Sequence, residues 1–435
     1  MTVWDAMIGQ PEAVRILRLA ALEGRAIVEA ARAPREAAVS DSGTDSAATD
    51  SIVTGATVAG AASDSALSQE VRPGALSHAW LITGPPGSGR SVAARCLAAA
   101  LQCTGEPIGC GMCPGCHTTM QGTNPDVQQY ATEKRIIEVK AVRDWVARSY
   151  DAPAGGRWRI SVAEDADRIA ERTAGVLLKA VEEPPARGIW VLCAPTLADV
   201  IPTIRSRCRH VALVTPSVDA VAQYLAEAEG VDYSEARRAS ALAQSHVGVA
   251  RALLRNPQIR VERTEAVRAL VTPSAPGSAV VAADRVFEQA KVQAAQMTQA
   301  RSRREREDLA RSLGVKEGQR VPPALRAQMR ALEEDQKRRD SRALQDALDR
   351  TFIDLMGFYR DVLVVQLGSA AELVNADIEQ EVREVAQASS PAQTLARTDA
   401  IDIARANLQT QAAPQLIVEA LAVRLATPRL VGDFG

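Results

Sequence analysis

The stretch that most constrains the fold is "ITGPPGSGRSVAAR", residues 82–95. The apolar run "AWLIT" (79–83) leads into it, and an alanine-rich segment suited to a helix follows it. A glycine-rich turn that joins a buried strand directly to a helix belongs to parallel α/β architecture. We therefore expect a parallel sheet with crossover helices in this part of the chain.

The glycine stretch has the spacing G-x-x-x-x-G-[KR]-[ST] of a phosphate-binding loop. Gly84, Gly87 and Gly89 would let backbone N–H groups converge on phosphate oxygens, and Ser91 would offer a hydroxyl to magnesium. Arg90 stands where an ATPase keeps lysine, and its planar guanidinium cannot take the place of a compact ammonium. The pattern favours binding of ATP and magnesium without efficient hydrolysis. A structural turn that holds no ligand is the alternative.

An acidic group follows a second apolar run in "ISVAEDADRI", with Glu164, Asp165 and Asp167. Magnesium-dependent ATPases place an aspartate first to organise the metal and a glutamate second to orient water. Here the order is Glu then Asp, so the second carboxylate is one methylene short. A misplacement of about 1 Å costs on the order of a hundredfold in rate. Metal binding stays possible and hydrolysis is disfavoured; a solvated acidic turn is the alternative.

Three regions are predicted from composition and pattern. Further buried strands are expected in "RWRISVAE" (157–164) and "IWVLCA" (189–194), with helical stretches between them. The sequence predicts an α/β domain over 1–213, a small helical domain over 214–270 and a longer helical domain over 271–435.

Two segments interrupt this plan. Residues 24–74 are rich in Ala, Ser, Thr, Asp and Gly, so we expect a disordered insertion whose first part extends the preceding helix. Residues 300–342 are dense in charge and predict a solvated helical excursion, with a DNA or partner contact as the alternative. Beyond it, spacings of three and four predict one buried helix face formed by Leu344, Leu348, Phe352, Leu355, Tyr359 and Leu363.

Four cysteines lie close together in "CTGEPIGCGMCPGC": Cys103, Cys110, Cys113 and Cys116. Their C-x6-C-x2-C-x2-C spacing, with Gly and Pro between them, allows four thiolates to close around zinc. A closed set of four thiolates predicts a structural rather than a catalytic site. Free thiols or a redox pair are the alternatives. The other three cysteines, Cys96, Cys193 and Cys208, are expected to be ordinary buried residues.

Three arginines alternate in "PTIRSRCRHVAL", residues 202–213, just before another apolar strand. One interpretation is an exposed edge with charges facing water. The other is an arginine offered to the γ-phosphate of a neighbouring subunit, where such a group contributes about 10³- to 10⁵-fold in rate.

Bulk composition limits the partners. The net charge is −2 and aromatic residues are 3% of the chain, which argues against strong DNA binding by the isolated protein. The start lacks the features of a signal peptide, and no apolar run reaches about 18 residues. A cytoplasmic protein without a membrane span is therefore expected.

Taken together, "GPPGSGRS", the four cysteines, "EDADRI" with "LLKAVEEPP" (177–185) and "SRC" (206–208) resemble the delta-prime family of bacterial DNA polymerase III clamp-loader subunits. The resemblance is strong over residues 76–213. It is weaker in the helical remainder, where 407–425 resemble the closing helix of the family's collar. It implies an α/β AAA+ domain with a P-loop NTPase-like sheet, followed by a helical lid and an all-α collar.

The resemblance also implies function. Such subunits sit with gamma/tau motor subunits and a delta subunit in a hetero-pentameric ring that loads the sliding clamp onto primed DNA. Arg207 corresponds to the arginine that completes a neighbour's ATP site, and Ser206 and Cys208 would shape its turn. Gly248 and Arg251 match the sensor-2 segment of the lid. The sensor-1 position falls on Ala194 or Pro195, with Thr196 as the nearest polar residue.

The sequence thus predicts a bacterial replication subunit that is a weak or inactive ATPase and gives an arginine to its neighbour. Two other functions stay open. One is an ATP-hydrolysing motor subunit of the same loader. The other is a zinc-dependent nucleic-acid-binding module with a relic AAA+ fold.

Overall fold

The chain folds into two compact units, Met1–Tyr224 and Leu225–Gly435. The computed structural model describes residues 2–37, 73–132, 137–155, 157–272, 275–312, 326–408, 410 and 412–427. Within these residues, no helix is both long enough and apolar enough to cross a membrane. The predicted three-domain division stays a prediction.

The first unit is built on a five-stranded sheet with the order β2-β3-β4-β1-β5, in which every pair is parallel. This confirms the predicted α/β class. Strands predicted from apolar runs are central and fully buried. The bounds are β1 Ala79–Thr83, β2 Val127–Tyr130, β3 Arg159–Ala163, β4 Gly188–Ala194 and β5 Arg209–Ala212.

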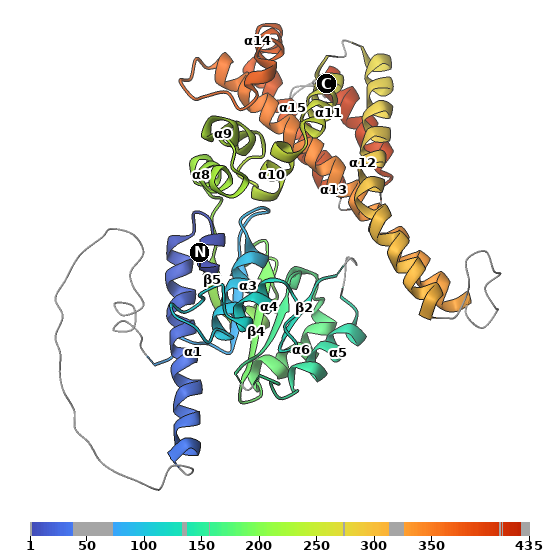
Figure 1. Cartoon of the computed structure of the whole chain (residues 1–435). Coiled ribbons are helices and arrows are strands. Elements are labelled where there is room, and N and C mark those ends of the chain that lie inside the picture. The colour runs from blue at the N-terminus through green and yellow to red at the C-terminus, as the bar shows by residue number, and fades with distance from the viewer. Residues whose placement is uncertain are drawn as a thin grey trace, which may run out of the picture. The chain divides into compact units, whose positions relative to one another are not determined.

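Helices cover both faces of this sheet (Figure 1). Side chains alternate along β1, so that Trp80 and Ile82 enter one core while Ala79 and Leu81 enter the other. The helical elements of this unit are η1 Val3–Ala6, α1 Pro11–Ala37, α3 Arg90–Leu101, α4 Pro114–Met120, α5 Val139–Ser149, η2 Ala166–Arg168, α6 Glu171–Glu182 and α7 Pro202–Arg205; α8 Val218–Glu229 leads into the second unit.

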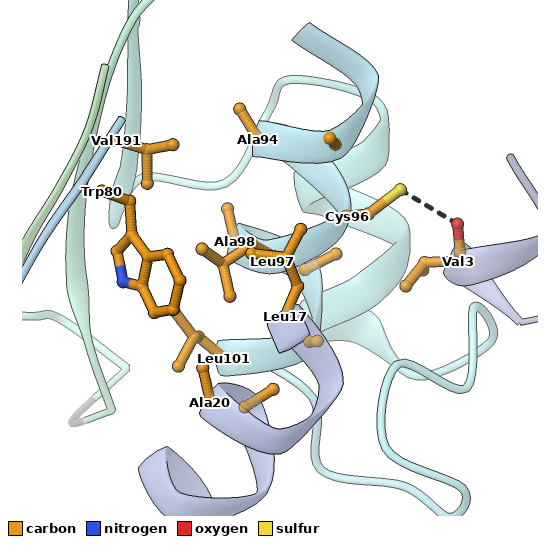
Figure 2. Packing of buried hydrophobic residues seen from close by; sticks show 14 of the residues in the cluster. Val3, Leu17, Ala20, Trp80, Ala94, Cys96, Leu97, Ala98, Leu101 and Val191 are labelled. Atoms are coloured by element: carbon orange, nitrogen blue, oxygen red, sulfur yellow. Dashed lines mark hydrogen bonds between the residues drawn. The ribbon is translucent and has the colours of Figure 1, made fainter. Parts of the chain in front are cut away.

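Helix α3, which begins at the glycine loop, lies at the centre of one core. Figure 2 shows Leu97 and Leu101 of α3 among Trp80 of the sheet and Leu17 of α1, all of them buried. The thiol of Cys96 on the same helix donates to the carbonyl oxygen of Val3 at 3.0 Å. The loop that precedes α3 is therefore held by a helix packed between the sheet and the N-terminal segment.

The first part of the segment predicted as an insertion extends the preceding helix, as expected, because α1 continues to Ala37. Burial explains the continuation: Val28 is fully buried, and Gly24 lies so close to Leu101 that a Cβ would approach it to 2.7 Å. The Glu23 carboxylate accepts a hydrogen bond from the backbone N–H of Gly74 at 2.7 Å, where the chain returns. Residues 38–72 of the predicted insertion lie outside the described residues.

The second unit is helical. Its elements are α9 Tyr233–Leu242, α10 Val247–Arg255, α11 Pro257–Val271, α12 Pro276–Ser312, α13 Arg326–Gln366, η4 Ala376–Ile378, α14 Glu379–Ala388, α15 Pro391–Leu408 and α16 Pro414–Ala426. Helices α11 to α16 share one hydrophobic core, and the boundary predicted at residue 270 falls within the last turn of α11, whose Leu270 belongs to that core. The predicted apolar face of α13 is confirmed, with Phe352 and Leu355 fully buried.

The described parts of the charged segment 300–342 are helical. They are the end of α12 and the start of α13, which pack side by side (Figure 1). Polar contacts join the two helices there: Arg339 pairs with Glu305 at 3.0 Å, and the amide of Gln336 donates to the carbonyl of Ser302 at 2.9 Å. The predicted helical excursion is confirmed for these residues. Residues 313–325 lie outside the described residues.

Candidate functional site

The glycine loop connects β1 to α3 in a conformation that requires glycine. Gly87 and Gly89 have φ angles of 84° and 90°, in the left-handed region that side chains disfavour. A Cβ on Gly84 would lie 2.5 Å from the Ser88 hydroxyl and 3.0 Å from the Leu213 carbonyl oxygen. These glycines therefore fix the path of the backbone into the N-terminus of α3.

Two polar atoms of the loop are buried without a hydrogen-bond partner among the described residues: the Ser88 hydroxyl and Nη1 of Arg90. Ser88 is only 4% exposed. Buried polar atoms without a partner are costly unless a ligand or water satisfies them. A hydroxyl and a guanidinium N–H at a helix N-terminus suit an anion such as a phosphate group.

The predicted acidic residues separate into two environments. The Ser91 hydroxyl donates to Oε2 of Glu164 at 3.1 Å, so Glu164 is the carboxylate beside the loop. Oδ2 of Asp165 instead accepts from the backbone N–H of Thr132 at 3.0 Å, and Oδ1 pairs with Arg168 at 3.6 Å. The first acidic position therefore keeps its contact with the loop hydroxyl, and the second is held by other partners.

The four predicted cysteines come together. Their sulfur atoms all lie within 4.8 Å of one another, and Cys103 Sγ is 3.7 Å from that of Cys110 and 3.8 Å from that of Cys113. All are free thiols rather than disulfides. A tetrahedron of sulfurs around a metal at about 2.3 Å has edges of about 3.8 Å. The cluster has the geometry to hold a metal ion.

Backbone groups support the cysteine cluster. The N–H of Cys113 donates to Cys110 Sγ at 3.3 Å, and that of Cys116 donates to Cys113 Sγ at 3.4 Å. A hydrogen bond from Cys116 lowers the pKa of Cys103 to about 4 despite the opposing effect of burial. The environment thus favours thiolate at Cys103, the form that binds metals.

The cysteine loop is fastened to the N-terminal segment. The Trp4 indole donates to the Ile108 carbonyl at 2.9 Å, and the Val3 N–H donates to the Gly109 carbonyl at 2.8 Å. Gly115 admits no side chain, because a Cβ there would lie 2.1 Å from the Gln102 carbonyl oxygen. Sequence reasoning missed these contacts, since nothing in Val3 or Trp4 indicates a partner a hundred residues away.

The remaining cysteines lie outside the cluster. Cys96 and Cys193 are buried as expected, whereas Cys208 is partly exposed. Burial raises the pKa of each of these thiols to about 12. These three groups remain protonated near neutral pH.

The three alternating arginines are all exposed, beside the edge strand β5, so the structure leaves both interpretations of them open. Arg205 ends α7, Arg207 lies in the following turn, and only Arg209 belongs to β5. Nη1 of Arg207 donates to the Thr203 carbonyl at 2.9 Å and to the Ser206 hydroxyl at 3.2 Å. Its Nε forms an ion pair with Glu182, and 41% of the side chain stays exposed. Arg207 is thus a cation at the surface with a defined orientation.

Arg251 belongs to the second unit, in α10. Its Nε donates to Oε1 of Glu229 at 2.7 Å, and Arg255 donates to the same carboxylate. The hydrogen bonds from Arg255 and Arg251 lower the pKa of Glu229. The acidic partner Glu229 carries no sequence signal and was missed. Gly248 lies one turn earlier in the same helix.

The predicted sensor-1 position has no polar side chain aligned with the loop. Ala194 ends β4 and is buried, and the Pro195 carbonyl accepts from the N–H of Gly84 at 3.1 Å. The Thr196 hydroxyl is bound to Asp199 at 2.8 Å. The nearest polar residue is therefore already engaged within its own turn.

Comparisons with known proteins concern mainly the α/β region. Residues 61–217 match the family model described as "DNA polymerase III, delta subunit". The chain is 34% identical over 157 residues to DNA polymerase III subunit delta' of Pseudomonas aeruginosa, covering 35% of this chain and 48% of that protein. It is 31% identical over 179 residues to the gamma/tau subunit of Mycobacterium tuberculosis, covering 39% of this chain and 30% of that protein.

The chain thus spans less than half the length of these curated relatives. A solved gamma subunit-related protein of Thermotoga maritima aligns over 80% of this chain and 94% of its own, at 14% identity and a TM-score of 0.37. The glycine loop, the acidic pair and the cysteine cluster all lie within the residues that the family model matches. On this evidence the α/β region of the chain is similar to the delta' and gamma/tau subunits of DNA polymerase III.

Proposed function

We propose that this chain is the delta-prime, or stator, subunit of a DNA polymerase III clamp loader and supplies Arg207 to the ATP site of a neighbouring motor subunit. Its partners would be gamma/tau-type motor subunits and a delta subunit in a five-membered ring. Through that complex it would act on the sliding clamp and primed DNA. The chain itself would contribute no ATP hydrolysis.

The observation that carries the proposal is the contrast between the loop and Arg207. At the loop, Asp165 is engaged by Thr132 and Arg168, and Arg90 replaces a lysine. Away from it, Arg207 is exposed and oriented. A site that lacks a well-placed water-orienting carboxylate is a poor hydrolase, whereas an exposed arginine can stabilise charge on a phosphate held by another protein.

The residues of the glycine loop suit binding of ATP and magnesium, but not hydrolysis of the bound ATP. The unpartnered Ser88 hydroxyl and Arg90 Nη1 would contact phosphate oxygens, and Ser91 with Glu164 would face the metal. Bound ATP would supply a triphosphate that orders the loop. Because Ser91 and Glu164 keep their contact, the loop could hold ATP and magnesium while the chain acts as a stator.

We also propose that the four cysteines hold one structural zinc ion. The sulfur separations near 3.8 Å match tetrahedral thiolate coordination, and no imidazole or carboxylate joins the cluster in the described part of the chain. Four protein ligands leave no open position for a substrate. The ion would fasten the loop that Trp4 and Val3 contact.

The test is reconstitution with a motor subunit and a delta subunit from the same organism. Arg207→Ala should leave the complex assembled, while hydrolysis at the site it serves falls on the order of 10³-fold in single-turnover measurements. Arg205→Ala is the matched control, because in the described part of the chain the Arg205 side chain donates to the Leu197 carbonyl, at 3.3 Å, and pairs with no carboxylate. Full hydrolysis in an assembled Arg207→Ala complex would reject the proposal.

A further inference from the structure

Arg207 is held by acceptors of its own chain. Its Nε pairs with Glu182, and its Nη1 contacts the Thr203 carbonyl and the Ser206 hydroxyl. Arginine has many rotamers, so an isolated exposed arginine samples a wide volume. Three acceptors on two sides of the guanidinium restrict it to one orientation while leaving 41% of the side chain exposed.

Glu182 is well placed to fix that orientation. It is the last residue of α6, and the preceding residue, Val181, is fully buried. Ile204, the buried residue of α7, packs in the same core cluster as Val181. Because both backbones are anchored in one core, the separation between Glu182 and Arg207 is set by packing rather than by chance contact at the surface.

The neighbouring arginines have other partners. Arg205 donates to the Leu197 carbonyl at 3.3 Å. Arg209 donates to the Ala75 carbonyl at 2.5 Å, and its guanidinium lies 5.2 Å from the centroid of the Trp80 ring. Among these three arginines, within the described residues, the ion pair with a carboxylate is specific to Arg207.

We infer that Glu182 is a positioning residue for Arg207 and orients its guanidinium for the phosphate of a neighbouring subunit; this inference rests on the proposed trans role of Arg207. An exposed ion pair adds little to stability, because water competes for both charges. Its effect is instead on orientation, since a group already aimed at its target loses less freedom when the target arrives. Glu182 thereby acts on the rate of the neighbour's reaction without touching its nucleotide.

The experiment uses the reconstituted loader with Glu182→Ala, Glu182→Gln and Glu183→Ala. Glu183 is the matched control, because it is the adjacent exposed carboxylate. Its backbone carbonyl, rather than its carboxylate, accepts from the Tyr150 hydroxyl at 3.4 Å. We expect Glu182→Ala to lower kcat for ATP about twofold to fivefold, the range that corresponds to an exposed ion pair, with KM unchanged. Glu182→Gln, which keeps an acceptor, should lose less. Glu183→Ala should behave as the unaltered chain.

A double variant separates positioning from a structural role. Glu182→Ala in the Arg207→Ala background should cause no further loss, because the residue acts through the arginine. Gel filtration and thermal unfolding of each complex check that assembly and folding are kept. An unchanged or raised kcat in assembled Glu182→Ala, or an additive loss in the double variant, overturns the inference while leaving the Arg207 result intact. A lack of effect of Arg207→Ala itself would instead reject the proposed function.

Discussion

The Ser91 hydroxyl donates to the Glu164 carboxylate across 3.1 Å, which joins the glycine loop to the end of β3. The next residue, Asp165, does not share this contact and accepts from the Thr132 backbone instead. Two adjacent carboxylates therefore have separate tasks. One can face a metal beside the loop, and the other secures a turn at the edge of the sheet.

This separation predicts that the purified chain does not hydrolyse ATP, and that Asp165→Glu does not restore hydrolysis. The longer carboxylate would still meet the Thr132 N–H and Arg168. Phosphate release by the isolated chain, with and without DNA, is the measurement, and Arg90→Ala is the control. A DNA-stimulated ATPase that disappears in Arg90→Ala would instead identify a motor subunit.

The cysteine cluster predicts about one equivalent of zinc per chain, lost in Cys113→Ser. Removal of one thiolate opens a closed site, and metal binding free energy contributes directly to folding. The variant should therefore unfold at a lower temperature, by several degrees. Elemental analysis and calorimetry check both results. Cys208→Ser, which removes a thiol outside the cluster, should keep the metal; a metal-free Cys113→Ser protein as stable as its parent would contradict the assignment.

Helix α10 predicts a pH-dependent contribution to stability. His246 caps this helix, because its Nδ1 accepts from the Val249 N–H at 3.3 Å. His246 stays open to solvent on one side, but desolvation by the atoms packed around it and the charge of Arg350 lower its pKa below the ordinary value of 6.5. The folded state therefore prefers the neutral ring. This contribution is complete above pH 6.5 and declines as the pH falls below it, when the unfolded chain takes up the proton first.

The corresponding measurement is the urea midpoint at pH 7.5 and at pH 5.5. Loss of a helix cap costs about 1 kcal/mol, so acidification should lower the stability of the parent by up to that amount. His246→Asn keeps a capping oxygen that does not titrate, and it should flatten this part of the pH dependence. An identical pH dependence in parent and variant would contradict the role of the cap.

The sequence was informative where a pattern is repeated or local. Strands β1, β3 and β4 are buried on both faces and appear as continuous apolar runs, so they were predicted. Strand β2, "VQQY", lies at the edge of the sheet and is only partly buried, and its polar residues gave no strand signal. The four cysteines are close in sequence, and their spacing already implied the cluster.

Other parts of the site depend on contacts between distant residues. Glu182 meets Arg207, and Glu229 meets Arg251, only because helices bring them together. An isolated glutamate in a helix gives no indication of its partner. The same holds for Gly24, whose lack of a side chain allows α1 to pack closely against Leu101.

The Glu23 carboxylate accepts hydrogen bonds from the backbone N–H groups of Gly74 and Leu76, and this bears on how the chain tolerates changes in length. A carboxylate on α1 positions the returning chain before β1. Closing a loop costs only about 0.6 kcal/mol more for each doubling of its length. Additions or deletions within residues 38–72 should therefore leave the sheet, the glycine loop and Arg207 undisturbed, which makes this stretch a natural place for a foreign peptide or a reporter label.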